Sequence, residues 1–255
     1  MDNVFFAKEA GVGKITINRP EKSNTLDAEI IRTLRRMIQS AEADPNLRIL
    51  TVTGSGERVF CAGVDLKASL ASGKGEEGFG RSDFRQLLFE LVRFPKPTVA
   101  LARGHVMGGG LGIVLACDLC LACEDVHFST PEIQVGMFPM MVFGLLHRHV
   151  GRKKATEMMF LGERIMAPQA KELGIINHAI PREQFDIRAE EFLRSLAQKS
   201  TTILSMGKAA VSHLMDENLH EEEIFLESAL VEVMATEDSR EGIRAFVEKR
   251  PPRWN

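Results

Sequence analysis

The sequence lacks several features that would assign it to a class at once. Its 255 residues include no tyrosine, one tryptophan and four cysteines, and the net charge is −3. No block of lysine and arginine stands out, so the electrostatic footprint of a nucleic-acid-binding protein is missing. The longest apolar stretches, such as 138–146, fall well short of the roughly 20 residues of a membrane-spanning helix. The first 14 residues also lack the apolar core of a secretory signal. We therefore expect a cytoplasmic protein with no nucleic-acid and no membrane partner.

The few cysteines include three at a spacing that resembles an iron–sulfur motif. Cys117, Cys120 and Cys123 are separated by two residues each, but position 127 holds His127 and the remaining cysteine is the distant Cys61. A fourth ligand is therefore missing, and the flanking residues are apolar. We expect buried, reduced thiols that pack like small hydrophobic residues, and no metal site. Zinc-ligand spacings and the serine nucleophile elbow are also absent.

Hydrophobic periodicity predicts alternating strands and helices. Alternation over Lys14–Asn18 predicts a strand, apolar spacing over Leu26–Ala41 predicts a helix, and Arg48–Thr53 is typical of a buried strand. The pattern returns with a helix over Phe84–Val92 and a strand over Thr98–Ala102. Further elements are expected as an extended Leu119–Ala122 and as helices over Leu111–Ala116, Phe143–Val150, Ala155–Leu161, Pro168–Leu173, Ala189–Gln198, Leu204–Met215, Glu222–Ala235 and Arg240–Lys249. Residues 1–190 are therefore expected to form the core and 191–255 a helical region, while Ser69–Ser82 is expected to be a surface loop.

Two glycine-containing segments are the strongest candidates for a site. Phe60–Leu66 follows a predicted strand, and its small residues Ala62 and Gly63 permit a ligand to approach the backbone. Met107–Gly112 contains three consecutive glycines between a strand and a helix. Its amides would lie at a helix N-terminus, where free N–H groups and the helix dipole favour negative charge. The two segments together predict a site for an anion.

These segments carry a resemblance to a known family. The motifs are Ile17–Pro20, Phe60–Leu66, Gly108–Gly110, Ala116–Asp118, Pro131–Glu132 and Phe246–Pro251. With them, nearly the whole chain resembles the crotonase (enoyl-CoA hydratase/isomerase) family. The resemblance implies an α/β fold, a spiral of repeated ββα units whose C-terminal helices form trimers, commonly paired into hexamers. It also implies an acyl-CoA thioester as substrate, with coenzyme A as part of that substrate and no metal or redox cofactor.

The resemblance also implies roles for individual residues. The N–H groups of Val64 and Gly109 would form the oxyanion hole that holds the thioester oxygen as enolate charge develops. Substrate-binding residues in the coenzyme A cleft would be Ala62, Asp65, Leu66 and Lys67. The adenine and phosphate end would lie near Lys22, Asn24 and Leu26, with Phe246 and Lys249 reaching it from the C-terminal helix.

The acid–base residues depart from the family pattern. Family hydratases typically use two glutamates, of which this chain keeps Glu132, whereas the other position is Gly112. Glu132 beside an apolar acyl pocket would have a raised pKa and could exchange a proton near neutral pH. Gly112 would leave room for water or for a bulkier acyl group. A position that holds a further acid in some members is Met140, which would suit an apolar acyl chain or the core equally well.

Three functions remain open from the sequence. Hydration of trans-2-enoyl-CoA leads narrowly, because one carboxylate can position one water. Double-bond isomerisation is the first alternative, because one carboxylate can also carry a proton between two carbons. The second alternative is an acyl-CoA-binding relative with little activity, which kept the oxyanion hole but lost efficient catalysis with the first glutamate.

Overall fold

The strands form two sheets in the computed structural model, which describes residues 2–66, 81–216 and 219–253. The larger sheet has the order β1 (Val4–Glu9), β2 (Val12–Ile17), β3 (Ile49–Gly54), β5 (Thr98–Ala102), β7 (Leu119–Cys123), β10 (His178–Ile180). The smaller sheet has the order β4 (Val59–Cys61), β6 (His105–Met107), β8 (His127–Ser129), β9 (Arg164–Met166). The β1–β2 and β8–β9 pairs are antiparallel, and the other pairs are parallel.

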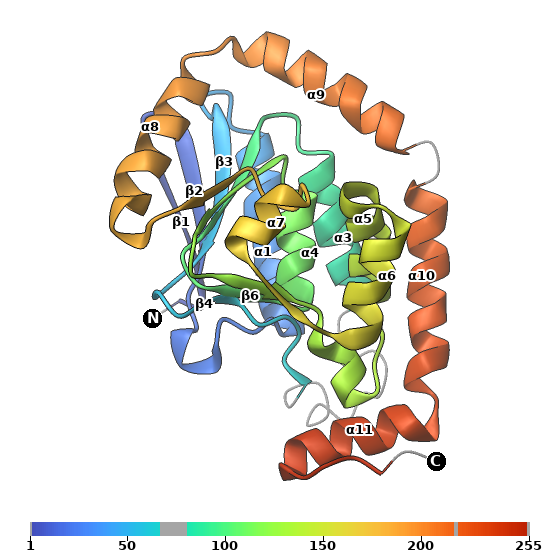
Figure 1. The fold of residues 1–255 in the computed structure, drawn as a ribbon. Coiled ribbons are helices and arrows are strands. Elements are labelled where there is room, and N and C mark those ends of the chain that lie inside the picture. Colours follow the sequence, from blue (N-terminus) through green and yellow to red (C-terminus); the bar gives the residue numbers. More distant parts are fainter. Residues whose placement is uncertain (1, 67–80, 217–218, 254–255) are drawn as a thin grey trace.

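Helices pack against the sheets and then wrap around the outside. The α-helices are α1 (Ala28–Glu42), α3 (Arg81–Val92), α4 (Gly109–Ala116), α5 (Met140–Val150), α6 (Arg152–Leu161), α7 (Ala167–Glu172), α8 (Phe185–Ala197), α9 (Thr201–Asp216), α10 (Leu219–Met234) and α11 (Glu237–Glu248). Short 3-10 helices are η1 (Pro20–Lys22), η3 (Pro131–Val135) and η4 (Arg182–Gln184). In Figure 1, α9, α10 and α11 follow the periphery from the top, down one side, to the bottom. None of the helices in the described ranges has the length and apolarity of a membrane span.

The chain repeats one unit as it winds. In β3–β4–α3 and again in β5–β6–α4, the first strand joins the large sheet, the second joins the small sheet, and a helix follows. The next turn places β7 and β8 in the same two sheets before η3 and α5. This arrangement confirms the predicted spiral of ββα units. It also brings the ends of β4, β6 and β8 side by side, because these strands are neighbours in the small sheet.

The first long helix shows why the sequence folds this way. Asp27 accepts hydrogen bonds from the backbone N–H groups of Glu29 and Ile30, which caps α1. Its apolar residues recur at helical spacing, and Ile30, Leu34 and Ile38 are buried. The predicted helix over Leu26–Ala41 is therefore confirmed to within two residues.

Predictions were less accurate where an element is short or begins with polar residues. The C-terminal helices α8 to α11 begin three or four residues before their predicted starts. In α11, for example, the acidic Glu237 and Asp238 precede the apolar pattern. The small sheet was not predicted, since strands of three residues are too short to show alternation. The predicted boundary between residues 190 and 191 lies inside α8. Residues 69–80 of the predicted loop lie outside the described residues, whereas Arg81 and Ser82 begin α3.

Candidate active site

The loop after β4 pairs with the segment that precedes α1. The Leu26 N–H donates to the Gly63 carbonyl at 2.8 Å, and the Asp65 N–H donates to the Leu26 carbonyl at 2.8 Å. These two hydrogen bonds form a bridge between Leu26 and Val64. They use the Gly63 carbonyl and the Asp65 N–H, which flank Val64, and they leave the Val64 N–H out. Within the described ranges no protein group accepts a hydrogen bond from the Val64 N–H. Gly63 makes the bend with a φ of +85°, which glycine adopts without strain.

The loop after β6 supplies a second N–H group that the fold does not use. Gly108 has φ 53° and ψ −127°, and its N–H donates to the Ser129 carbonyl at 3.0 Å. Gly109 then begins α4, and its N–H has no acceptor among the described residues. The backbones are in close approach here, because a Cβ on Gly63 would lie 2.8 Å from the Gly109 nitrogen. The structure thus brings together the two segments that carry Val64 and Gly109, at a helix N-terminus that favours negative charge.

Glu132 lies beside these glycines. It belongs to η3, and the turn that follows is closed by a hydrogen bond from the Met137 N–H to the Glu132 carbonyl at 3.0 Å. A Cβ on Gly108 would lie 2.8 Å from Glu132 Oε1, so the carboxyl group touches the glycine loop. Its other oxygen, Oε2, is enclosed and has no hydrogen-bond partner in the described part of the chain. Burial raises the pKa of Glu132 to about 7.

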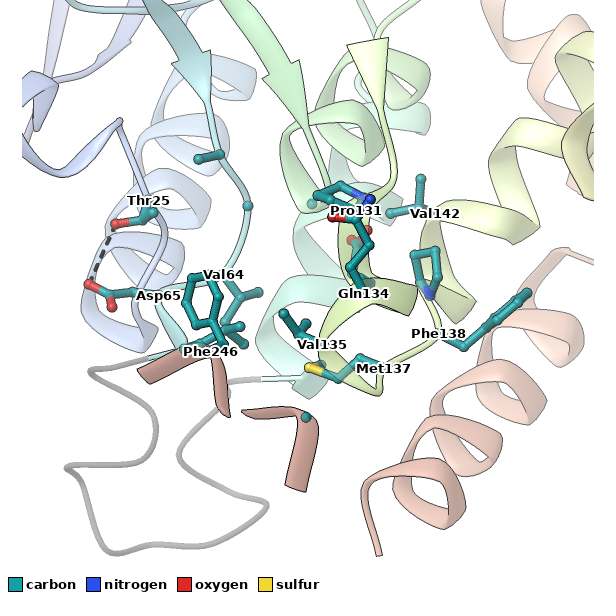
Figure 2. A pocket seen from close by; sticks show the side chains of 18 of the residues that line it. Thr25, Val64, Asp65, Pro131, Gln134, Val135, Met137, Phe138, Val142 and Phe246 are labelled. Carbon is teal, nitrogen blue, oxygen red and sulfur yellow. Dashed lines mark hydrogen bonds between the residues drawn. The ribbon is translucent and has the colours of Figure 1, made fainter. Parts of the chain in front are cut away.

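A cavity of about 980 Å³ connects these groups. Figure 2 shows Thr25, Asp65 and Phe246 at one end of it and Phe138 at the other, with Val64 and Val135 between. The first end also includes the exposed Lys22. The volume matches that of sites for ligands of drug size or larger. An elongated ligand with a polar end and an apolar end would fit this arrangement.

The space beside Gly112 is already occupied. A Cβ at this position would meet Val142 Cγ2 at 3.3 Å and both Leu88 Cδ2 and Phe84 Cζ at 3.4 Å. Gly112 is itself buried in α4. The expectation that Gly112 leaves room for water or a bulkier acyl group is therefore wrong. An apolar wall, with Val142 and Phe84 also lining the cavity, stands at the position where the resemblance leads one to expect a glutamate.

The other predicted residues divide into two groups. Lys22, Ala62, Asp65, Leu66 and Phe246 line the cavity, and Phe246 is 49% exposed. In contrast, Asn24 and Leu26 are 0% exposed and do not line the cavity. Lys249 is exposed at the C-terminus of α11 and also lies outside the lining. Lys67 lies outside the described residues. Met140 does line the cavity.

The Asn24 side chain bonds to neighbouring segments of the chain and does not line the cavity. Its side-chain N–H groups donate to the carbonyls of Ser55 at 3.0 Å and Val59 at 2.7 Å. Its side-chain oxygen accepts from the Arg19 N–H at 2.8 Å. The buried Arg19 guanidinium pairs with Asp65 at 3.6 Å, next to Val64. These bonds join the end of β2 to the strand and loop that carry the first free N–H group.

Sequence reasoning missed several cavity residues. Phe84 and Leu230 belong to apolar helical stripes, which predict core packing and do not distinguish a core face from a cavity wall. Arg250 also lines the cavity, where it is held by Glu241 at 2.6 Å and Glu248 at 2.6 Å. The signal that could have indicated Arg250 is its place in the C-terminal motif over Phe246–Pro251.

The cysteines and histidines do not join the site. All four cysteines are free and buried, as expected, and burial raises the pKa of the Cys61 thiol to about 12. His105 stacks on His127 with ring centroids 3.7 Å apart, and neither lines the cavity. No group of three or more potential metal ligands occurs in the described part of the chain.

Comparisons with known proteins agree with this geometry. A family model described as enoyl-CoA hydratase/isomerase matches residues 7–255. Enoyl-CoA hydratase domain-containing protein 3 of Xenopus laevis is 31% identical over 97% of this chain and 84% of its own length. The crystal structure of an enoyl-CoA hydratase/isomerase from Xanthobacter autotrophicus Py2 has a TM-score of 0.87 at 28% identity, covering 98% of this chain and 97% of that one. A carnitinyl-CoA hydratase from Mycobacterium avium has a TM-score of 0.86 at 27% identity, covering 99% and 98%.

Proposed function

The chain belongs to the enoyl-CoA hydratase/isomerase family, and we propose that it shifts the double bond of an enoyl-CoA thioester with Glu132 as the one proton carrier. The observation that carries this proposal is the apolar wall at Gly112. Of the described cavity-lining residues, the acids are Glu21, Asp65 and Glu132. Asp65 is held by Arg19, and Glu21 is exposed beside Lys22. Glu132 is therefore the acid that touches the glycine loop carrying the Gly109 N–H.

The proposed reaction needs one carboxylate and no water. The ionised Glu132 removes a proton from C2 of a 3-enoyl thioester, and the electron pair moves onto the thioester oxygen. The N–H groups of Val64 and Gly109 donate to that oxygen, where fixed donors stabilise the developing charge. Protonated Glu132 then gives the proton to C4, the double bond forms between C2 and C3, and the carboxylate returns to its ionised form. A pKa near 7 suits both halves of this transfer.

Hydration is the second candidate, supported by the names of the relatives and by the same carboxylate. Glu132 would take a proton from water while the water oxygen bonds to C3 of a 2-enoyl thioester. The enolate would be held by the same two N–H groups, and Glu132 would return the proton to C2. This route needs a positioned water, but the side chains around Gly112 are apolar and offer it no hydrogen bond. The packing therefore favours isomerisation.

One experiment separates the candidates. Purified protein is incubated with trans-3-hexenoyl-CoA and, separately, with trans-2-hexenoyl-CoA, while the ultraviolet absorbance of the conjugated thioester is followed. Isomerisation increases the absorbance with the first substrate at unchanged product mass, whereas hydration decreases it with the second and adds the mass of water. Glu132→Gln should lose either activity, and Glu124→Gln, an exposed glutamate outside the cavity, should keep it. Lack of reaction with both substrates would overturn the proposal in favour of thioester binding alone.

We also propose self-association through the C-terminal helices, as the family resemblance implies. Large apolar side chains are exposed on α8 and α9, among them Ile187 at 63%, Ile203 at 67% and Met206 at 66%. Where such side chains form one contiguous patch, the patch is commonly an interaction surface. Analytical ultracentrifugation tests this, with a trimer or a dimer of trimers expected and a monomer contradicting it.

A further inference from the structure

A second cavity lies against the far end of the first. It has a volume of about 600 Å³ and shares the wall residues Gln134, Met137, Phe138 and Pro252 with the first cavity. Its other walls include Val233 at the end of α10 and Thr236 at the start of α11. Of the shared residues, Met137 and Phe138 are apolar neighbours in the chain, and we call these two the partition. Figure 2 shows Met137 and Phe138, which line both cavities, on the side of the first cavity away from Thr25 and Asp65.

The two residues of the partition differ in how firmly they are held. The Phe138 ring packs edge-on against Phe143, with centroids 6.2 Å apart, and against Phe160 at 6.1 Å. Met137 has an unbranched side chain with three rotatable bonds, which adapts to irregular space. Met137 is 8% exposed and belongs to the turn that follows η3. A chain-like ligand can therefore displace the Met137 side chain while Phe138 stays in its aromatic cluster.

The cavity wall between Glu132 and the partition is largely apolar, with Gln134 as a polar side chain. Besides Phe84 and Val142, it includes Met140, Met141 and Leu230. A charged group on an acyl chain would lose its water along this wall, and the carboxylate of Asp238 in the second cavity would repel a terminal carboxylate there, which costs binding. Each methylene group would instead gain from leaving water. The wall thus selects an unsubstituted hydrocarbon chain.

We propose that the substrate carries an unsubstituted acyl chain long enough to pass the partition, so that its tail lies in the second cavity. The inference rests on the proposed function, because the thioester must lie on the Val64 and Gly109 N–H groups for the chain to take this direction. Because the polar part of the thioester would lie at the end of the first cavity near Lys22, the acyl group would lie at the apolar end. The preferred substrates are then medium- and long-chain thioesters, whose acyl chains continue past the partition into the second cavity.

Binding of saturated thioesters tests this without any reaction. Isothermal titration calorimetry is performed with free coenzyme A and with butyryl-, octanoyl-, dodecanoyl- and ω-carboxyoctanoyl-CoA. A buried methylene lowers Kd by at most about fourfold. We expect octanoyl-CoA to bind at least about tenfold more tightly than butyryl-CoA, dodecanoyl-CoA more tightly again, and the ω-carboxy compound about tenfold more weakly than octanoyl-CoA.

Two variants locate the effect. Val233→Phe fills the second cavity from α10 and should lower the ratio of butyryl-CoA Kd to dodecanoyl-CoA Kd by about tenfold. Val247→Phe makes the same substitution on α11 at a side chain that is 39% exposed and lines neither cavity, and should leave that ratio unchanged. Circular dichroism and the melting temperature confirm that each variant is folded.

The outcomes distinguish this proposal from the function on which it rests. Equal affinity for butyryl- and dodecanoyl-CoA, each tighter than for free coenzyme A, would overturn the chain-length inference and leave the proposed function standing. An unchanged ratio in folded Val233→Phe would overturn the second cavity as the tail site. Acyl thioesters that bind no better than free coenzyme A would remove the proposed function as well.

Discussion

The raised pKa of Glu132 predicts a specific pH dependence of stability. Burial holds the folded pKa at about 7, against an ordinary value of 4.5. Between these values the native state keeps a proton that the unfolded chain has released. The unfolded state therefore binds fewer protons, and the free energy of unfolding falls as pH rises from 4.5 to about 7. The stabilising contribution of protonated Glu132 is fully present below pH 4.5 and is lost above about pH 7.

The magnitude follows from the two pKa values. A shift from 4.5 to about 7 corresponds to about 3 kcal/mol at 1.36 kcal/mol per unit. Between about pH 5.5 and 8.5 the linkage relation leaves about 2 kcal/mol of this change within reach. Glu132→Gln removes this ionisable group. The amide that replaces it changes the free energy of unfolding by an amount that does not depend on pH. The difference in unfolding free energy between the two proteins should therefore shift by about 2 kcal/mol in favour of the variant across this range.

Urea unfolding at fixed protein concentration measures this difference. Wild type and Glu132→Gln are unfolded in parallel at several pH values, with the slope of each transition checked for agreement before the free energies are compared. A fixed concentration is needed because self-association would stabilise both proteins by mass action. Parallel curves across the whole range would refute the argument, since they would show that Glu132 titrates alike in the folded and unfolded states.

Four further outcomes are expected. The value of kcat/KM should rise with pH through about 7 as Glu132 ionises, and Glu132→Gln should lower it by about 10²- to 10⁴-fold; a flat profile would exclude Glu132 as the base. Gly109→Pro deletes an N–H at the first position of α4, where proline is tolerated, and should lower kcat by about 10²- to 10³-fold relative to Gly109→Ala, so equal rates in steady-state assays would exclude this donor. Gly108→Ala should reduce both activity and stability, by about 1–3 kcal/mol in urea unfolding, because its φ is 53° and its Cβ would lie 2.8 Å from Glu132 Oε1. Lys208→Met breaks a 2.6 Å ion pair with Asp118 beneath α9 and should lower stability by about 1–3 kcal/mol, with little further loss when Asp118→Asn is added.

Much of the architecture could be predicted from the chain alone. Long elements such as α1 and β3 bury one face or both, so their apolar residues recur with the period of the element. The glycine segments indicated the two free N–H groups, because glycine marks places where the backbone is approached closely or turns sharply. The raised pKa expected for Glu132 also agrees with its burial in the structure.

The site required contacts between segments that are distant in the sequence. Asn24 and Leu26 were expected to contact substrate, yet they are buried by neighbours 30 or more residues away, as in the Asn24–Val59 hydrogen bond. The space at Gly112 is filled by Val142 and Phe84, which approach α4 from α5 and α3. No local pattern encodes such approaches.

The sequence by itself determined the alternation of strands and helices and the two glycine loops, because each depends on residues close together in the chain, whereas Glu132 was indicated by the family resemblance. Only the tertiary structure decided what surrounds them. The apolar wall beside Gly112, the isolated Oε2 atom of Glu132 and the cavity beyond Met137 and Phe138 arise where separate helices pack. Packing across space sets both the dielectric around a carboxylate and the shape of a cavity, and these two properties decide which reaction and which acyl chain the site favours.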